Sequence, residues 1–184
     1  SATNQNDVQL VTELNGEDIH LKYIPSAYLF SDLDRHAYFN DMKAGHTDYT
    51  FELDDEGNPY WVITRYDNAI GITEQKAIGT EIINAQTGET NIYDIENTPK
   101  WVDRIQPSYY INNYLNKWGE LVHGILNFSD KDKLKPTQGM NIIFNDDECY
   151  YYTGITSVGN DEGLVGFMLT NTRTGETKMY NTSG

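Results

Sequence analysis

An internal repeat constrains the fold of this chain more than any other feature of its sequence. Residues 79–94 align without gaps on residues 166–181, which begin 87 positions later (166 minus 79). Self-similarity at a fixed spacing indicates that one supersecondary unit occurs twice. The identities are an opening glycine, an asparagine, a Thr-Gly-Glu-Thr block and a tyrosine: Gly79, Asn84, 87–90 and Tyr93 match Gly166, Asn171, 174–177 and Tyr180.

The repeated segments have the pattern of β-hairpins. Runs rich in Ile, Thr and Tyr flank each Thr-Gly pair, and Gly88 and Gly175 can supply the positive φ that a tight turn needs. Further upstream, residues 51–61 resemble residues 142–152 in pattern, at a spacing of 91 (142 minus 51), as an apolar run, an acidic turn and an aromatic run. Each copy is therefore expected to hold two hairpins, which together make a four-stranded antiparallel meander.

A helical stretch precedes each predicted meander. Ser31 or Asp32 can cap the first helix, and Gly45 suits its C-terminal exit. The second helix is expected after Pro107, a residue that suits a first helical turn. The apolar residues expected on one helix face are Phe30, Leu33, Ala37 and Met42 in the first stretch, and Ile111, Tyr114, Leu115, Trp118, Leu121, Val122 and Ile125 in the second.

The sequence thus predicts an α+β fold of two tandem units, each a helix packed on a four-stranded antiparallel meander. We expect residues 1–25 to form an N-terminal segment with one strand around residues 19–24, and residues 26–98 and 99–184 to form the two units. A single unit of this size has a thin core, and no linker separates the two. The units are therefore expected to pack together.

Charge and cysteine content exclude several classes of partner. The chain has 13 Lys and Arg against 28 Asp and Glu, a net charge of −15, which disfavours nucleic acid and anionic membrane surfaces. Cys149 is the single cysteine, so neither an intramolecular disulfide nor a cysteine-based zinc site can form. Its place in a predicted strand indicates a small structural residue rather than a reactive thiolate. No apolar run approaches the roughly 20 residues that span a bilayer.

One cluster of side chains is the candidate ligand-binding site: Trp101, Asp103, Arg104, Trp118 and His123. In a functional interpretation Arg104 pairs with an anionic group, the Trp rings form walls, and His123 acts as a base near neutral pH. In the alternative interpretation Asp103 and Arg104 make a local ion pair and the Trp rings belong to the core. The alternative is favoured because aromatic residues at helical spacing generally pack inside.

Known catalytic and metal-binding templates are absent from the sequence. There is no G-x-S-x-G, H-E-x-x-H or G-x-G-x-x-G motif. His20, His36 and His46 lack the i, i+4 spacing of a helical metal pair, and the acidic turns at 54–57 and 145–148 lack the calcium loop pattern. We therefore predict no catalytic residues, no metal and no cofactor, and we expect that the chain is not an enzyme.

The two Thr-Gly turns carry a family resemblance. The segments Asn-Ala-Gln-Thr-Gly-Glu at 84–89 and Asn-Thr-Arg-Thr-Gly-Glu at 171–176 resemble the D-A-x-T-G-E hairpin of the PepSY family, with Asn in place of the commoner Asp. PepSY units are small helix-and-meander domains of bacterial envelope and secreted proteins. The resemblance implies a PepSY/cystatin-like fold for each unit.

A wider resemblance covers most of the chain. Residues 59–64, 101–107, 118–124 and 152–159 are similar to segments of uncharacterised bacterial proteins that have an N-terminal membrane segment. This resemblance implies an extracytoplasmic domain in the bacterial cell envelope, tethered through a segment that precedes Ser1. It transfers no catalytic residue.

Three functional hypotheses follow. The preferred one is a non-enzymatic extracytoplasmic binding or regulatory domain of a membrane-anchored protein, which binds a protein or peptide partner through sheet edges and Tyr-rich surface. The second is a small-ligand module or enzyme with a pocket around the second helix. The third is a structural spacer.

Overall fold

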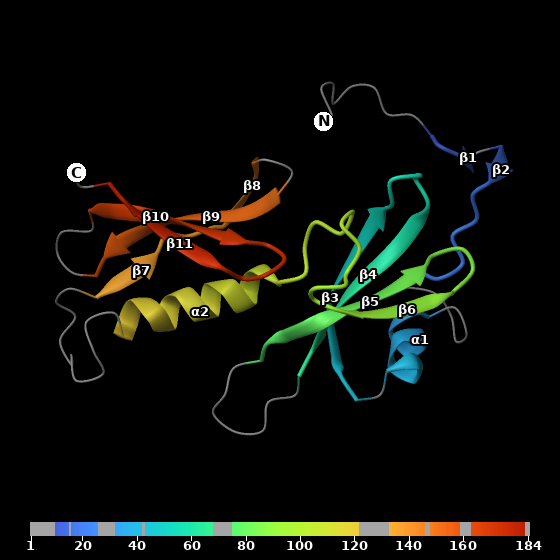
Figure 1. The fold of residues 1–184 in the computed structure, drawn as a ribbon, viewed down its shortest axis with the longest axis horizontal. Coiled ribbons are helices and arrows are strands. Elements are labelled where there is room, and N and C mark those ends of the chain that lie inside the picture. Colours follow the sequence, from blue (N-terminus) through green and yellow to red (C-terminus); the bar gives the residue numbers. More distant parts are fainter. Residues whose placement is uncertain are drawn as a thin grey trace.

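In the computed structural model the described residues are 10–14, 16–25, 32–41, 43–67, 75–121, 133–145, 148–158 and 163–182. They form an α+β fold in which two helices accompany antiparallel sheets, as the sequence predicts for the fold class (Figure 1). The elements in chain order are β1 (Glu13–Leu14), β2 (Glu17–Asp18), α1 (Leu33–Asn40), β3 (Gly45–Leu53), β4 (Pro59–Tyr66), β5 (Ala77–Asn84), β6 (Thr90–Asp94), α2 (Ser108–Leu121), β7 (Leu134–Pro136), β8 (Asn141–Asn145), β9 (Glu148–Ser157), β10 (Leu164–Asn171) and β11 (Thr177–Asn181).

The first sheet has four antiparallel strands in the order β3-β4-β5-β6. Alternate residues of a strand point to opposite faces, and α1 packs on one of these faces. Leu33 and Ala37 of α1 form a buried cluster there with Ile63 of β4 and Ile83 of β5. One face of this sheet is therefore closed by the helix that precedes it in the chain.

The start of α1 agrees with the sequence, and its end differs. Asp32 caps the helix, because its side chain accepts a hydrogen bond from the Arg35 N–H at 2.9 Å. The helix ends at Asn40, whereas the predicted exit residue, Gly45, already begins β3. The other cap candidate, Ser31, and the apolar candidates Phe30 and Met42 lie outside the described residues.

The second sheet has five strands, in the order β11-β10-β9-β7, with β8 also paired to β9. The helix α2 packs on one face through Ile111 and Leu115, which form a buried cluster with Tyr151, Ile155 and Met168. Among the other residues predicted for this helix face, Trp118 is half-buried, Tyr114 and Leu121 are exposed, and Val122 and Ile125 lie outside the described residues.

Two short strands share one edge of β9, where the sequence predicts a single strand. The strand β7 pairs with the end of β9, and β8 pairs with its beginning. The break between them contains Gly139, which has a φ of 86°. In the first sheet the edge strand β3 is also irregular, between Thr47 and Thr50, where Asp48 has a φ of 51°. Both edge strands are thus interrupted near their middle.

The two Thr-Gly turns have the same hydrogen bonds. The Asn84 side chain accepts from the N–H groups of Gln86 (2.9 Å) and Thr87 (3.0 Å), and the Asn171 side chain accepts from those of Arg173 (2.9 Å) and Thr174 (3.0 Å). The turn glycines have φ values of 79° and 76°, which confirms the predicted left-handed conformation at both positions.

The segment before α1 is extended but is not the strand predicted for residues 19–24. The N–H groups of Lys22 and Tyr23 both donate to the carbonyl of Ala85, at 2.8 and 3.0 Å, rather than forming a ladder. The Trp61 indole donates to the carbonyl of Tyr23 at 2.7 Å. The strands at this end of the chain are instead β1 and β2, which pair with each other.

The segment before α2 has the corresponding contacts. The N–H groups of Ile105 and Gln106 both donate to the carbonyl of Thr172, at 3.0 and 2.8 Å, and the Tyr151 hydroxyl donates to the carbonyl of Gln106 at 2.8 Å. This stretch, residues 98–106, is named here the covering segment. It runs between the two sheets (Figure 1).

The covering segment closes the second face of the first sheet. Val102 and Ile105 are fully buried in a cluster with Val62 and Ile82, which lie opposite the α1 face. The Thr64 hydroxyl donates to the carbonyl of Ile105 at 2.8 Å. The first sheet is therefore covered on both faces, by α1 and by a segment that leads into α2.

Candidate functional site

The sequence-predicted site residues of the covering segment have structural contacts. The Trp101 ring packs against Tyr60 with the ring centroids 5.3 Å apart. Nε of Arg104 lies 3.5 Å from Oδ2 of Asp48, with both side chains partly exposed. Asp103 is exposed between them in the chain. These three predicted residues therefore lie together along one extended segment.

The structure does not bring Trp118 to this segment. Trp118 packs with the core of the second sheet, whereas Trp101 packs with the core of the first. The last predicted member, His123, lies outside the described residues. The two Trp rings do not form the walls of one pocket, and each contributes to a different core.

One possible acid-base pair was missed at the sequence level. Nε2 of His46 lies 2.9 Å from Oε2 of Glu81, and the two side chains are 7% and 0% exposed. A histidine beside a carboxylate can transfer protons, but only to a substrate that reaches it. Both side chains are closed off from solvent, so no substrate reaches the pair in this structure. The sequence feature that could have indicated this pair is Glu81, a glutamate inside the otherwise apolar run at 77–83.

The single thiol also lacks catalytic character. Cys149 is buried, and this burial raises the pKa of its thiol. A nucleophilic cysteine needs a lowered pKa and access to solvent. The structure therefore agrees with the predicted role of Cys149 as a small strand residue.

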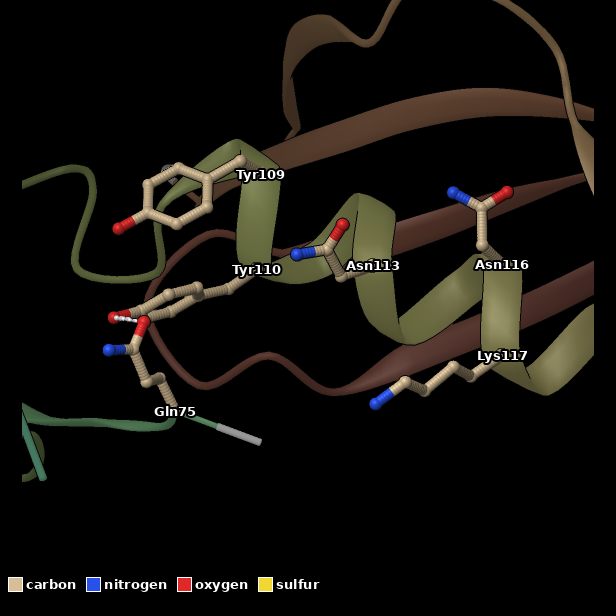
Figure 2. A pocket seen from close by; sticks show the side chains of 6 residues that line it. All are labelled: Gln75, Tyr109, Tyr110, Asn113, Asn116 and Lys117. Carbon is tan, nitrogen blue, oxygen red and sulfur yellow. Dashed lines mark hydrogen bonds between the residues drawn. The ribbon is translucent and has the colours of Figure 1, made fainter. Parts of the chain in front are cut away.

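A shallow pocket of about 340 Å³ lies along α2. Figure 2 shows Tyr110 and Gln75 meeting at one end, where the hydroxyl donates to Oε1 at 3.4 Å, while Asn113, Asn116 and Lys117 line the helix side. Its lining groups are amides, phenols and one amine, without a carboxylate or imidazole. None of the predicted site residues lines this pocket.

The strand registers show which residues of the two sheets correspond. Asn84 pairs with Tyr60 on the neighbouring strand, and its counterpart Asn171 pairs with Tyr150. Tyr60 therefore corresponds to Tyr150, at a spacing of 90 (150 minus 60), one residue less than the sequence pattern indicated. A shift of one residue exchanges the two faces of a strand.

With this register, α1 and α2 lie on corresponding faces of their sheets. The two opposite faces also correspond, but one is covered and the other is exposed. In the first sheet that face is closed by the covering segment. In the second sheet this face borders an exposed hollow of about 560 Å³ and is here named the open face. No element of the described part of the chain lies over it. The residues of the open face used below are Glu148, Tyr150, Phe167, Leu169, Glu176 and Tyr180.

Aromatic rings run across the open face from strand to strand. The Phe167 ring stacks on Tyr180 of β11, with centroids 5.0 Å apart and planes at 11°, and contacts Tyr152 of β9 at 5.5 Å. At one side lies β8, whose residues are all exposed, including Ile143 and Phe144. Within the described residues, no strand pairs with the outer edge of β8. The second sheet thus presents an aromatic surface beside an unpaired edge.

No group of three or more His, Cys, Asp or Glu side chains that could hold a metal occurs in the described ranges. Neither described helix is long and apolar enough to cross a membrane. The chain matches no family model, no curated protein and no solved structure.

Proposed function

We propose that this chain is a non-enzymatic extracytoplasmic binding domain of a bacterial membrane-anchored protein, and that it binds a protein partner through the open face of the second sheet. The extracytoplasmic and membrane-anchored setting is taken from the resemblance of residues 59–64, 101–107, 118–124 and 152–159 to proteins of that kind. The binding role is taken from the geometry of the sheet.

We also propose that the chain is a tandem pair of PepSY-like units. The support is a set of matched contacts: the same asparagine-to-turn hydrogen bonds, and a carbonyl that takes two N–H groups in each copy, from Ala85 and from Thr172. In each copy an aromatic side chain of the sheet also donates to the segment before the helix, from Trp61 and from Tyr151.

The observation that carries the binding role is the open face. It combines exposed aromatic and aliphatic side chains with carboxylate, amide and amine groups. Exposed apolar surface rimmed by polar residues marks interaction sites. Tyrosine suits such a site because its ring gives apolar contact and its hydroxyl remains hydrogen-bonded. A peptide segment is the occupant that fits a sheet face beside the outer edge of β8, with which no described strand pairs.

The experiment is selection of binding peptides from a random library displayed on phage, followed by amide chemical-shift mapping on the intact ¹⁵N-labelled chain. Binders should shift amides of β9 and β10 on the open face, and L169K should abolish their binding. The exposed-site variant F39D, on α1, should bind normally, since Phe39 is 68% exposed and remote from this face. Binders that shift only other surfaces, or a library without binders, would refute the proposal.

A second candidate function rests on the pocket along α2. Its amide and phenol groups could orient a small polar ligand, which would make the chain a small-ligand module. A fragment screen by NMR tests this: shifts confined to Tyr110, Asn113 and Asn116 would support the module. Fragments that shift only the open face would argue against it.

A further inference from the structure

The open face of the second sheet corresponds to a face of the first sheet that the chain covers with its own residues, the covering segment. In the first sheet, the covering segment places the Trp101 ring on Tyr60 and buries Val102 and Ile105 completely. Beneath it, Val62 is 1% exposed and Ile82 is 3% exposed. This shows what chemistry such a face accepts: a short segment without a strand ladder, turned at Pro99–Val102, that carries an aromatic residue followed by aliphatic residues.

The residues at corresponding positions of the second sheet remain partly exposed. Ile82 corresponds to Leu169 and Tyr93 to Tyr180, at the repeat spacing of 87, and Tyr60 corresponds to Tyr150. Leu169 is half-buried where Ile82 is buried, and Tyr180 is exposed where Tyr93 is half-buried, whereas Tyr60 and Tyr150 are both half-buried. The geometry of the first sheet is thus reproduced without its cover.

The charges of the open face and of the whole chain indicate which segments of a partner could bind there. Glu148, Glu176 and Lys178 all line the open face, so its two carboxylates and one ammonium leave one net negative charge. Glu148 accepts a hydrogen bond from the Tyr150 hydroxyl, and Glu176 forms an exposed pair with Lys178 at 3.6 Å. The whole chain carries a net charge of −15, which attracts cations and repels acidic peptides. The stacked rings of Phe167 and Tyr180 also present π-faces on which Arg or Lys can lie.

We infer that the open face binds a short, positively charged segment of another protein that carries an aromatic residue followed by aliphatic residues. This inference rests on the proposed function and adds the chemical class of the partner. The segment would lie on the second sheet as residues 98–106 lie on the first, with its aromatic side chain on Tyr150 and its cations toward Glu148 and Glu176.

The probe is a synthetic peptide, TPKWVNRIQP, which copies residues 98–107 with Asn in place of the aspartate to raise its charge. Its affinity for the intact chain is measured by fluorescence anisotropy, and its position by amide shifts. We expect shifts on β9, β10 and β11. Replacing the peptide's Trp and Ile by Ala should weaken binding at least about tenfold, because buried aromatic anchors dominate such interfaces. Replacing its Lys and Arg by Glu should weaken binding similarly at low salt and less at high salt.

Two protein variants locate the contact. L169K should abolish binding, and the milder Y180S, at an exposed position, should weaken it several-fold with the fold intact by circular dichroism. F39D, the matched exposed aromatic outside the face, should bind as the wild type does.

Each other outcome overturns the inference in a distinguishable way. If acidic or proline-rich library peptides occupy the open face and the cationic probe does not, the partner class is wrong and the proposed function stands. If no peptide binds there, both fail. Probe shifts on β4 and β5 would mean that the peptide only replaces the chain's own covering segment. A dimer that buries the open face, detected by sedimentation, would make a second copy the occupant.

Discussion

Gly79 and Gly166, the residues that open the two repeats, lie where a neighbouring strand leaves no space for a side chain. A Cβ on Gly79 would lie 1.9 Å from the carbonyl oxygen of Tyr93, and one on Gly166 would lie 2.3 Å from that of Tyr180. Glycine in a strand often marks such a close backbone approach. The identity at this repeat position therefore has a steric cause.

This contact gives a prediction with an internal control. G166A should lower the free energy of unfolding by about 1–3 kcal/mol, because the added methyl group must displace backbone atoms. G163A should change it by less than about 0.5 kcal/mol, since no atom lies within 4 Å of that Cβ position. Urea denaturation measures both. Equal effects would mean that the close approach does not determine the glycine.

A second prediction at the residue scale concerns Asp41, next to the end of α1. Two nitrogens of Arg65 lie 2.6 Å from its Oδ2. Burial acts to raise the pKa of Asp41, but the hydrogen bond and charge of Arg65, with the N–H groups of Lys43 and Ala44, outweigh it and hold that pKa below its ordinary value. The folded-state pKa is therefore lower than the unfolded value of about 3.9.

The sign of the pH dependence follows. The contribution of Asp41 is fully present above its unfolded pKa and is lost as the pH falls through its folded pKa. D41N should lower the free energy of unfolding by about 1–3 kcal/mol at pH 7, and the difference from wild type should shrink below about pH 4. Urea titrations at several pH values measure this, with the exposed D55N as control. A difference that persists at low pH would indicate packing rather than charge.

At the scale of elements, Arg173 connects the second Thr-Gly turn to the covering segment. Its guanidinium donates to the carbonyls of Thr98 (2.7 Å) and Pro99 (2.9 Å) and also to that of Val102. Burial lowers the pKa of Arg173, but an arginine remains protonated in proteins. One side chain therefore satisfies three carbonyls of a segment that has no ladder of its own.

R173M should release this segment while keeping most of the side-chain length. We expect a loss of about 1–3 kcal/mol in the free energy of unfolding, since three acceptors lose a charged donor. Amide exchange at Val102 and Ile105 should accelerate, as measured by hydrogen exchange with NMR. K178M, at a side chain that is 68% exposed, is the control. Unchanged exchange in R173M would mean that apolar burial alone holds the segment.

The elements also show how far the sequence could predict this structure. The turn glycines, the Asp32 cap and the apolar positions Ile111 and Leu115 were predictable, because turn geometry and helical spacing are local signals. The register was not, because three consecutive tyrosines at 150–152 fit either face and a pattern match cannot choose between them. The split into β7 and β8 depends on pairing with β9, which is also a long-range property.

The candidate site illustrates the same limit. Trp101, Asp103 and Arg104 are close in sequence, but the contact of Trp101 with Tyr60 and that of Arg104 with Asp48 come from distant strands. The open face could not be predicted because exposure depends on what covers a sheet. Only the comparison of two corresponding faces, one covered and one exposed, identifies it.

At the scale of the whole molecule, the covering segment contacts both sheets. It is buried against the first sheet and hydrogen-bonded to the second through Thr172 and Arg173. We expect a single unfolding transition, with amide signals of Ile63 and Ile155 lost at the same urea concentration. Midpoints that differ between these two reporters would show that the sheets unfold independently.

Residues 98–106 both cover the first sheet and lead into α2. This arrangement has a consequence for how a chain of this kind could grow by gene duplication. A new copy inserted after β11 would bring its own leading segment, and this segment would close the face that is now exposed without any change in the older sheets. The exposed aromatic face would then pass to the newest copy. In such a lineage an exposed aromatic face of this kind would occur on a unit whose sheet is not followed by another leading segment.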